Sequence, residues 1–251
     1  MPRRRRRLHH DLEVRDVSIA LYTDADNTLW DTDAVYAAAQ LGLLHALSAS
    51  LTRSQELDDA AALRFVRMHD QRIARLHPNG LQYPPELLAR SLHLALGGSD
   101  SHDDFSDTLL AYGESLAAVP VLRPGVAEGM AVASTRFGKF TVVTETNEGR
   151  CTKLLERHGL SRHVGRVASA TKSIGSFGAL RQRGAKNVMI GDQLDRDIAY
   201  ARDAGFRTIL FPGTFSPYWL DNTEAEPDYV IHDYADVPHI LDQIQRIELD
   251  A

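Results

Sequence analysis

Short apolar runs occur near the start of the chain and repeatedly in its second half. They are rich in β-branched or aromatic side chains, which is typical of strands buried on both faces of a sheet. We expect strands in VSIALYT (17–23), FTVVT (140–144), NVMIG (187–191), RTILFP (207–212) and DYVI (228–231), with VGRVAS (164–169) as a weaker sixth candidate.

Between the later runs, apolar residues follow the spacing of amphipathic helices, and Gly125 opens one further helix. The helical stretches cover residues 147–158, 172–183 and 195–204. Alternating strands and helices predict an α/β fold with a doubly wound, Rossmann-like parallel sheet. Such sheets bind ligands beyond the carboxyl ends of their strands, so catalytic groups are expected there.

Residues 33–119 interrupt this alternation, because they contain no convincing strand. Their apolar spacing instead predicts four helices, at residues 33–49, 54–76, 84–96 and 103–116. We therefore expect a basic and mobile tail (1–15), a core made of residues 16–32 and 120–251, and an inserted all-helical cap (33–119).

Charge and composition limit the kinds of partner that the chain can have. Arg3 to Arg7 hold five positive charges, and without them the net charge of −6 becomes −11. This acidic body argues against nucleic acid as the main partner and makes a solvated tail the simpler interpretation. No apolar run is long enough for a membrane span or a secretory signal. Cys151 is the single cysteine, which fits a reducing cytoplasm.

Polar residues follow four of the predicted strands at their carboxyl ends. These ends lie on one side of a parallel sheet, so residues distant in sequence converge. The candidates are Asp24 and Asp26 after the first strand, Thr144 and Glu145 after the second, Lys172 after the weak strand, and Asp192 and Asp197 in GDQLDRD, with Asp195 between them.

Clustered carboxylates repel one another unless a cation lies between them. Oxygen ligands suit Mg²⁺, which prefers one or two carboxylates together with phosphate oxygens. Lys172 and Thr144 would add positive charge and a hydrogen bond for a phosphate dianion. The residues therefore predict phosphoryl transfer to a carboxylate nucleophile, with Mg²⁺ as cofactor.

YTDADNTLW resembles the first motif, DxDx[TV], of the haloacid dehalogenase (HAD) superfamily. Thr144 is similar to its second motif, Lys172 to its third, and GDQLDRD to its fourth in the GDxxxxD form. The order and the intervals agree over residues 17–212. The helical insert directly after the first motif resembles the C1-type cap of that family.

The resemblance implies a role for each matched residue. Asp24 would be the nucleophile and Asp26 the general acid and base. The metal would be bound by the Asp24 carboxylate, the backbone carbonyl of Asp26 and Asp192, with Asp197 as a direct or outer ligand. The remaining groups would hold the phosphoryl oxygens or the substrate; they are Thr144, Lys172 and Glu145.

The second aspartate of the first motif narrows the reaction that the resemblance implies. Dehalogenases and phosphonatases of the family lack it, so Asp26 favours a phosphatase of a small phosphorylated metabolite. A phosphomutase of the same family and a non-catalytic binding module remain alternatives. The residues leave open the identity of the ester, the oligomeric state and a metal role for Asp195.

Substrate selection is expected to depend on the cap and on one loop of the core. The candidate cap contacts are Arg72, His77, Asn79 and Tyr83, near HPNGLQYPP, although loop or surface roles explain them as well. The candidate core contacts, in FPGTFSPYW, are Phe215, Tyr218 and Trp219, which can equally pack against the sheet edge.

Overall fold

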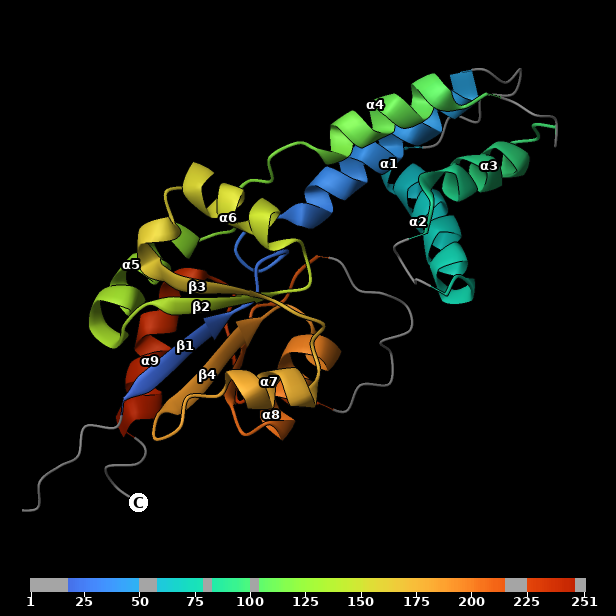
Figure 1. The fold of residues 1–251 in the computed structure, drawn as a ribbon. Helices are drawn as coiled ribbons and strands as arrows, with labels where there is room; N and C mark the ends of the chain where they lie inside the picture. The colour runs from blue at the N-terminus through green and yellow to red at the C-terminus, as the bar shows by residue number, and fades with distance from the viewer. Residues whose placement is uncertain (1–17, 50–57, 79–82, 100–103, 215–224, 247–251) are drawn as a thin grey trace, which may run out of the picture.

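The computed structural model describes residues 18–49, 58–78, 83–99, 104–214 and 225–246. Within them, six strands form one parallel sheet (Figure 1). Its strands are β1 (Ile19–Thr23), β2 (Phe140–Thr144), β3 (Val164–Ser169), β4 (Lys186–Gly191), β5 (Arg207–Leu210) and β6 (Tyr229–Val230). The arginine tail, Asn79, Phe215, Tyr218 and Trp219 lie outside the described residues.

The strands lie in the order β3-β2-β1-β4-β5-β6, a doubly wound topology. The chain runs outward from β1 to β3 and then returns to the other side of β1 with β4. A crevice therefore opens between the carboxyl ends of β1 and β4, where the winding reverses. Both strands are buried almost throughout, which explains why they are continuous apolar runs in the sequence.

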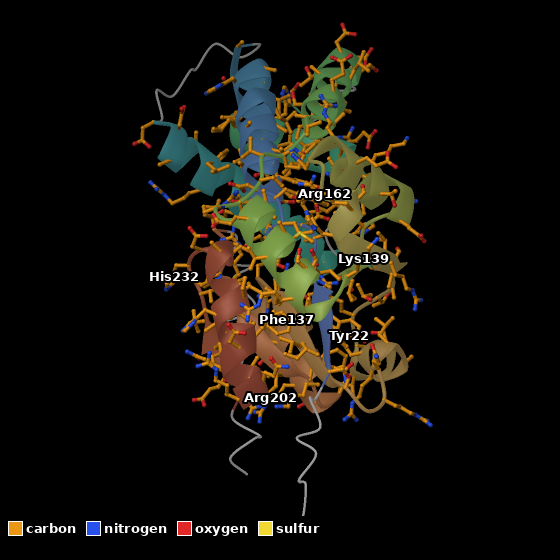
Figure 2. The ribbon with its side chains drawn as sticks, turned by 90° about the vertical axis from the view of Figure 1, so that its left-hand side faces the viewer. Tyr22, Phe137, Lys139, Arg162, Arg202 and His232 are labelled. Atoms are coloured by element: carbon orange, nitrogen blue, oxygen red, sulfur yellow. The ribbon has the colours of Figure 1, made fainter. Side chains whose placement is uncertain are left out.

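Helices cover both faces of the sheet, because successive strand side chains point to opposite sides. Ile19 and Leu21 of β1 pack toward α5 (Val126–Phe137), α6 (Glu148–Arg157) and α9 (Val237–Arg246). Ala20 and Tyr22 pack toward α7 (Ile174–Leu180) and α8 (Tyr200–Asp203). Figure 2 shows α9 beside α5, with the exposed side chains of Lys139, Arg162, Arg202 and His232 around the core.

Four helices follow β1 and form the inserted cap above the strand ends (Figure 1). Three residues, Leu43, Val66 and Leu92, belong to the separate apolar cluster that joins these helices. The cap confirms the expected helical insertion. Its helices are α1 (Thr32–Ala49), α2 (Asp59–Leu76), α3 (Pro85–Ala95) and α4 (Ser106–Leu116).

All six expected strands are present, and β3 is a full strand of the sheet. Two expected core helices differ from the prediction. The helix expected at residues 172–183 is only Ile174–Leu180, because Ser173 caps it and Arg181 leaves the helical conformation. The helix expected at 195–204 begins as a π-helix, η2 (Leu194–Ala199), and continues as α8. None of the helices in the described ranges has the length and apolarity needed to cross a bilayer.

Candidate active site

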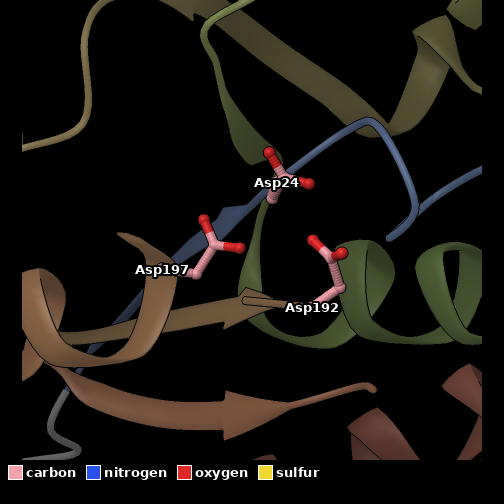
Figure 3. A group of neighbouring side chains, drawn as sticks. All are labelled: Asp24, Asp192 and Asp197. Atoms are coloured by element: carbon pink, nitrogen blue, oxygen red, sulfur yellow. The ribbon is translucent and has the colours of Figure 1, made fainter. Parts of the chain in front are cut away.

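Three carboxylates meet at the carboxyl ends of β1 and β4. Asp24 follows β1, Asp192 follows β4, and Asp197 lies on η2. Figure 3 shows the three side chains pointing toward a common space. One oxygen of each carboxylate lies within 4.8 Å of the others. The crevice at the reversal of winding therefore contains the acidic cluster that the sequence predicts.

Lys172 provides the positive charge of this cluster. Its ammonium nitrogen Nζ lies 2.5 Å from Asp24 Oδ1 and 2.6 Å from Asp197 Oδ1, and all three side chains are buried. Burial lowers the pKa of Lys172, but the carboxylates of Asp197 and Asp24 outweigh burial and hold the pKa above its ordinary value. Lys172 therefore remains an ammonium group.

One ammonium group does not neutralise three carboxylates. The four side chains together carry two excess negative charges when Asp24, Asp192 and Asp197 are ionised. Burial raises the pKa of Asp24 to about 7, with Asp197 adding to the effect. Burial, Asp24 and Asp197 likewise raise the pKa of Asp192 well above its ordinary value. Burial and mutual repulsion thus disfavour full ionisation of the cluster, and a further cation between the carboxylates would favour it.

The donor set fits a divalent cation of the Mg²⁺ type. All three candidate side-chain ligands offer carboxylate oxygen, the ligand type that Mg²⁺ prefers. Asp192 Oδ2 is buried and has no hydrogen-bond partner among the described residues, although a buried polar oxygen normally has one. The excess of two negative charges equals the charge of one such ion.

The backbone around the cluster brings the carboxylates close together. Gly191 ends β4, and a Cβ atom added there would lie 2.4 Å from Asp197 Cβ. A side chain at this position would therefore displace Asp197. Thr28 Oγ1 lies between the acids, 2.9 Å from Asp24 Oδ2 and 3.4 Å from Asp192 Oδ1. The π-helical turn that carries Asp197 is a feature often found at functional sites.

Asp26 lies in a different environment from Asp24. Its Oδ1 accepts hydrogen bonds from Trp30 Nε1 at 3.0 Å and Thr32 Oγ1 at 2.6 Å, and its Oδ2 accepts one from Thr146 Oγ1. Arg150 lies 3.6 Å from Oδ1. Burial raises the pKa of Asp26, but these donors outweigh burial and leave it below the ordinary value.

Thr144 and Glu145 differ in what they contact. Thr144 is buried at the end of β2, and its Oγ1 accepts a hydrogen bond from the Thr146 backbone at 3.1 Å. Glu145 Oε1 accepts one from the Lys172 backbone N–H at 2.8 Å, and Oε2 pairs with Arg196. The Glu145 carboxylate thus holds the loop that carries Lys172.

Sequence reasoning missed two neighbours of Asp26, namely Thr146 and Arg150. The signal for Thr146 was a second hydroxyl residue, two positions after Thr144 in the same loop. Arg150 lies in the first turn of α6, where nothing in the sequence ties it to Asp26. Asp195 is not part of the three-carboxylate group found among the described residues.

A cavity of about 390 Å³ adjoins the cluster. Its core wall includes Asp26, Thr146 and Arg150, and its cap wall includes Tyr83, one of the expected cap contacts. Arg72 and His77 are not among the lining residues. A cavity of this size accommodates a small organic molecule.

Comparisons with known proteins agree with the fold. Residues 169–237 match a family model described as HAD-hydrolase-like, and this range includes Lys172, Asp192 and Asp197. No curated protein matches the chain.

Solved structures resemble almost the whole chain. A haloacid dehalogenase-like family hydrolase from Xanthomonas campestris is 15% identical with a TM-score of 0.67, covering 94% of this chain and all of its own. A putative HAD-hydrolase from Bacillus subtilis bound to magnesium is 19% identical with a TM-score of 0.61, and coverage is 91% and 100%. A predicted phosphoglycolate phosphatase from Haemophilus somnus is 17% identical with a TM-score of 0.58, and coverage is 88% and 97%. The chain therefore has the fold of these solved structures, and its residues 169–237 are similar to the HAD-hydrolase-like family model.

Proposed function

We propose that the protein is a Mg²⁺-dependent phosphatase of the C1-capped type, acting on a small phosphate monoester. The observation that carries this proposal is the buried cluster of Asp24, Asp192, Asp197 and Lys172 with two excess negative charges. It lies beside a cavity whose wall contains a further carboxylate, Asp26. This combination suits attack on phosphorus by a carboxylate oxygen.

In the proposed reaction, an oxygen of Asp24 attacks phosphorus, and the bond from phosphorus to the ester oxygen breaks. Asp26 gives its proton to the departing alkoxide. Asp26 then removes a proton from the water that attacks phosphorus, the bond from phosphorus to the Asp24 oxygen breaks, and phosphate is released with Asp24 again a carboxylate. Asp24, Asp192 and Asp197 would hold the Mg²⁺, which supplies positive charge to balance the carboxylates and the phosphoryl oxygens.

Asp26 has to be protonated for the first step and ionised for the second. Its donors hold it ionised in the ester-free site, which suits the base of the second step. A dianionic ester beside it disfavours the ionised form and raises its pKa. The loop containing Thr144 and Thr146 is suited to hold phosphoryl oxygens through hydroxyl and backbone N–H groups.

Replacement of the nucleophile tests the proposal. Asp24→Asn is expected to lower the Mg²⁺-dependent release of phosphate from an aryl phosphate on the order of 10³-fold or more. The matched control is Asp203→Asn, an exposed aspartate at the end of α8. Acid quenching should trap phosphate on a peptide that contains Asp24. Equal activity of Asp24→Asn and wild type would contradict the mechanism.

Product analysis separates hydrolysis from isomerisation. One structural neighbour is a putative β-phosphoglucomutase from Thermotoga maritima, 14% identical with a TM-score of 0.60. A mutase would convert a sugar phosphate into its isomer and would require a sugar bisphosphate. Free phosphate from most esters tested, without a bisphosphate, is expected for the phosphatase. Tight binding of a protein partner without turnover would favour the binding module.

A further inference from the structure

The cap wall of the cavity has an unusual composition. Tyr36 comes from α1, Asp70 from α2, Tyr83 from the segment before α3, and Tyr112 from α4. Separate segments thus bring three phenol rings and one carboxylate to the same cavity. The same cavity has Asp26, Thr146 and Arg150 on its core wall, so an ester whose phosphate lies there would have its alcohol portion near the cap wall.

The Asp70 carboxylate acts electrostatically on each of the three tyrosines. Burial raises the pKa of Tyr36, Tyr83 and Tyr112, and in each case the Asp70 carboxylate raises it further. Tyr36 also raises the pKa of Tyr112. All four side chains line the same cavity, and we call this group the tyrosine cage: Tyr36, Asp70, Tyr83 and Tyr112.

Asp70 accepts its hydrogen bonds from neutral donors; burial raises its pKa, and these donors and the charge of Arg67 lower it only in part. Its Oδ2 accepts a hydrogen bond from Gln40 Nε2 at 3.1 Å, and its Oδ1 accepts one from the Tyr83 hydroxyl. Among the described residues, the lining of the cavity has three carboxylates and two guanidinium groups, a balance of one negative charge. Arg67 pairs with Asp33 at 2.5 Å, and Arg150 lies near Asp26.

A carboxylate among aromatic rings has a preferred type of ligand. Aromatic faces attract ammonium groups, and the attraction increases when the cation is removed from water. A carboxylate adds direct charge pairing, whereas a second anion on the ligand would be repelled by Asp70. If the cage served only to join the cap helices, packing would close it, but its four members line an accessible cavity.

We propose that the cavity takes a phosphate ester whose alcohol carries a protonated amine, with the ammonium group held by Asp70 within the tyrosine cage. This inference rests on the proposed phosphatase function, because it concerns the alcohol part of the same substrate. The phosphate would lie at the core wall of the cavity, beside Asp26 and Thr146, and the ammonium group at the cap wall, beside Asp70.

A set of matched esters tests the proposal in the wild-type protein with Mg²⁺. The esters are the aminoethyl to aminohexyl phosphates, together with the hydroxyalkyl and carboxyalkyl phosphates of equal length. At the best length, kcat/KM should be at least about tenfold higher for the amino ester than for the hydroxy ester. The carboxy ester should be the poorest substrate. An equal or reversed order at every length would overturn the proposal.

Substitutions in the tyrosine cage test whether these residues cause the preference for amino esters. Asp70→Asn should lower the ratio of kcat/KM values, amino over hydroxy, about tenfold. Asp59→Asn removes the same charge from an exposed position on the same helix and should leave the ratio unchanged. If Asp70→Asn fails to fold, Tyr36→Leu, at a half-exposed position on α1, should still reduce the ratio. An unchanged ratio in the folded cage variants would overturn the proposal.

Binding distinguishes failure of this inference from failure of the proposed function. Calorimetry with Asp24→Asn measures affinity for the aminoalkyl and hydroxyalkyl phosphates without requiring turnover. We expect the amino ester to bind about tenfold more tightly. Equal dissociation constants, or no binding of either ester, would overturn the inference. Aryl phosphate hydrolysis by the wild type would still support the phosphatase in that case.

Discussion

The reactive side chains at the strand ends follow strands of one parallel sheet, so the formation of the sheet itself brings them together. On the cap wall, by contrast, Asp70 and its three tyrosines are brought together only by the packing of helices. The first region carries two excess negative charges around a buried ammonium group, and the second carries a carboxylate held by neutral donors. The first is suited to a reaction common to all phosphate esters, and the second to selection among them.

In the strand-end region, the largest expected loss of stability follows replacement of Lys172. Lys172→Met leaves Asp24 and Asp197 buried without their ammonium partner. Loss of one partner of a buried pair costs about 3 kcal/mol or more, so the metal-free variant should unfold at much lower urea. Lys139→Met, at an exposed position, is the control. A loss below about 1 kcal/mol would mean that Lys172 is not the charge that holds the cluster together.

A somewhat smaller change in the free energy of unfolding is expected when Mg²⁺ is added. An ion that binds only the folded protein stabilises it by about 2.7 kcal/mol at one hundred times its dissociation constant. Asp192→Asn should remove most of this gain but should leave the metal-free protein at least as stable as wild type, because it removes one of three repelling carboxylates. Thermal unfolding with Mg²⁺ and with a chelator measures both quantities. Asp203→Asn should respond to Mg²⁺ as wild type does.

In the second region, a single hydroxyl is expected to affect substrate affinity more than turnover. Tyr83→Phe removes a hydrogen bond to Asp70 and should lower stability by about 1 kcal/mol. It should raise KM for the amino esters while kcat changes little, because no reacting atom is touched. Tyr200→Phe on α8 is the control. A large fall in kcat with constant KM would contradict the assignment of reaction chemistry to the strand ends and of substrate selection to the cap wall.

The smallest expected effect lies outside both regions, at Asp228. Burial raises its pKa, but hydrogen bonds from Thr208 N–H, Arg207 and the Thr208 hydroxyl outweigh burial and lower it. Because the pKa of Asp228 is lower in the folded state, its carboxylate stabilises the folded protein at pH values above the unfolded-state pKa of about 3.9. This stabilisation is lost as pH falls through the folded-state pKa. The advantage of wild type over Asp228→Asn, below about 1 kcal/mol near pH 7, should therefore shrink in acid. An advantage that grew below pH 4 would contradict this assignment.

The positions of Asp24, Asp192 and Lys172 followed from the sequence because parallel strands place their carboxyl ends on one side of the sheet. The surroundings of Asp26 did not, because Thr146 and Arg150 reach it through a turn and a helix start that no apolar spacing encodes. Asp70 was missed for a related reason. Within α2 it is an ordinary polar residue, and only the contact with Tyr83 distinguishes it.

The same limit explains the two core helices that differ from the prediction, one in length and one in type. A capping serine at position 173 moves the start of α7 past Lys172, so the lysine lies in a loop and reaches the carboxylates. The π-helical turn of η2 is not visible in periodicity, yet it carries Asp197 to the cluster. Both departures from regular helix bring a charged side chain to the site.

Two of the groups that hold Asp26 lie where the core passes into the cap. Trp30 precedes α1, and Thr32 is the first residue of that helix. Trp30 packs in the apolar cluster of the core, whereas Thr32 belongs to the first helix of the cap, so one carboxylate accepts hydrogen bonds from both units. A displacement of α1 that broke the Thr32 bond would remove one of the donors that lower the pKa of Asp26.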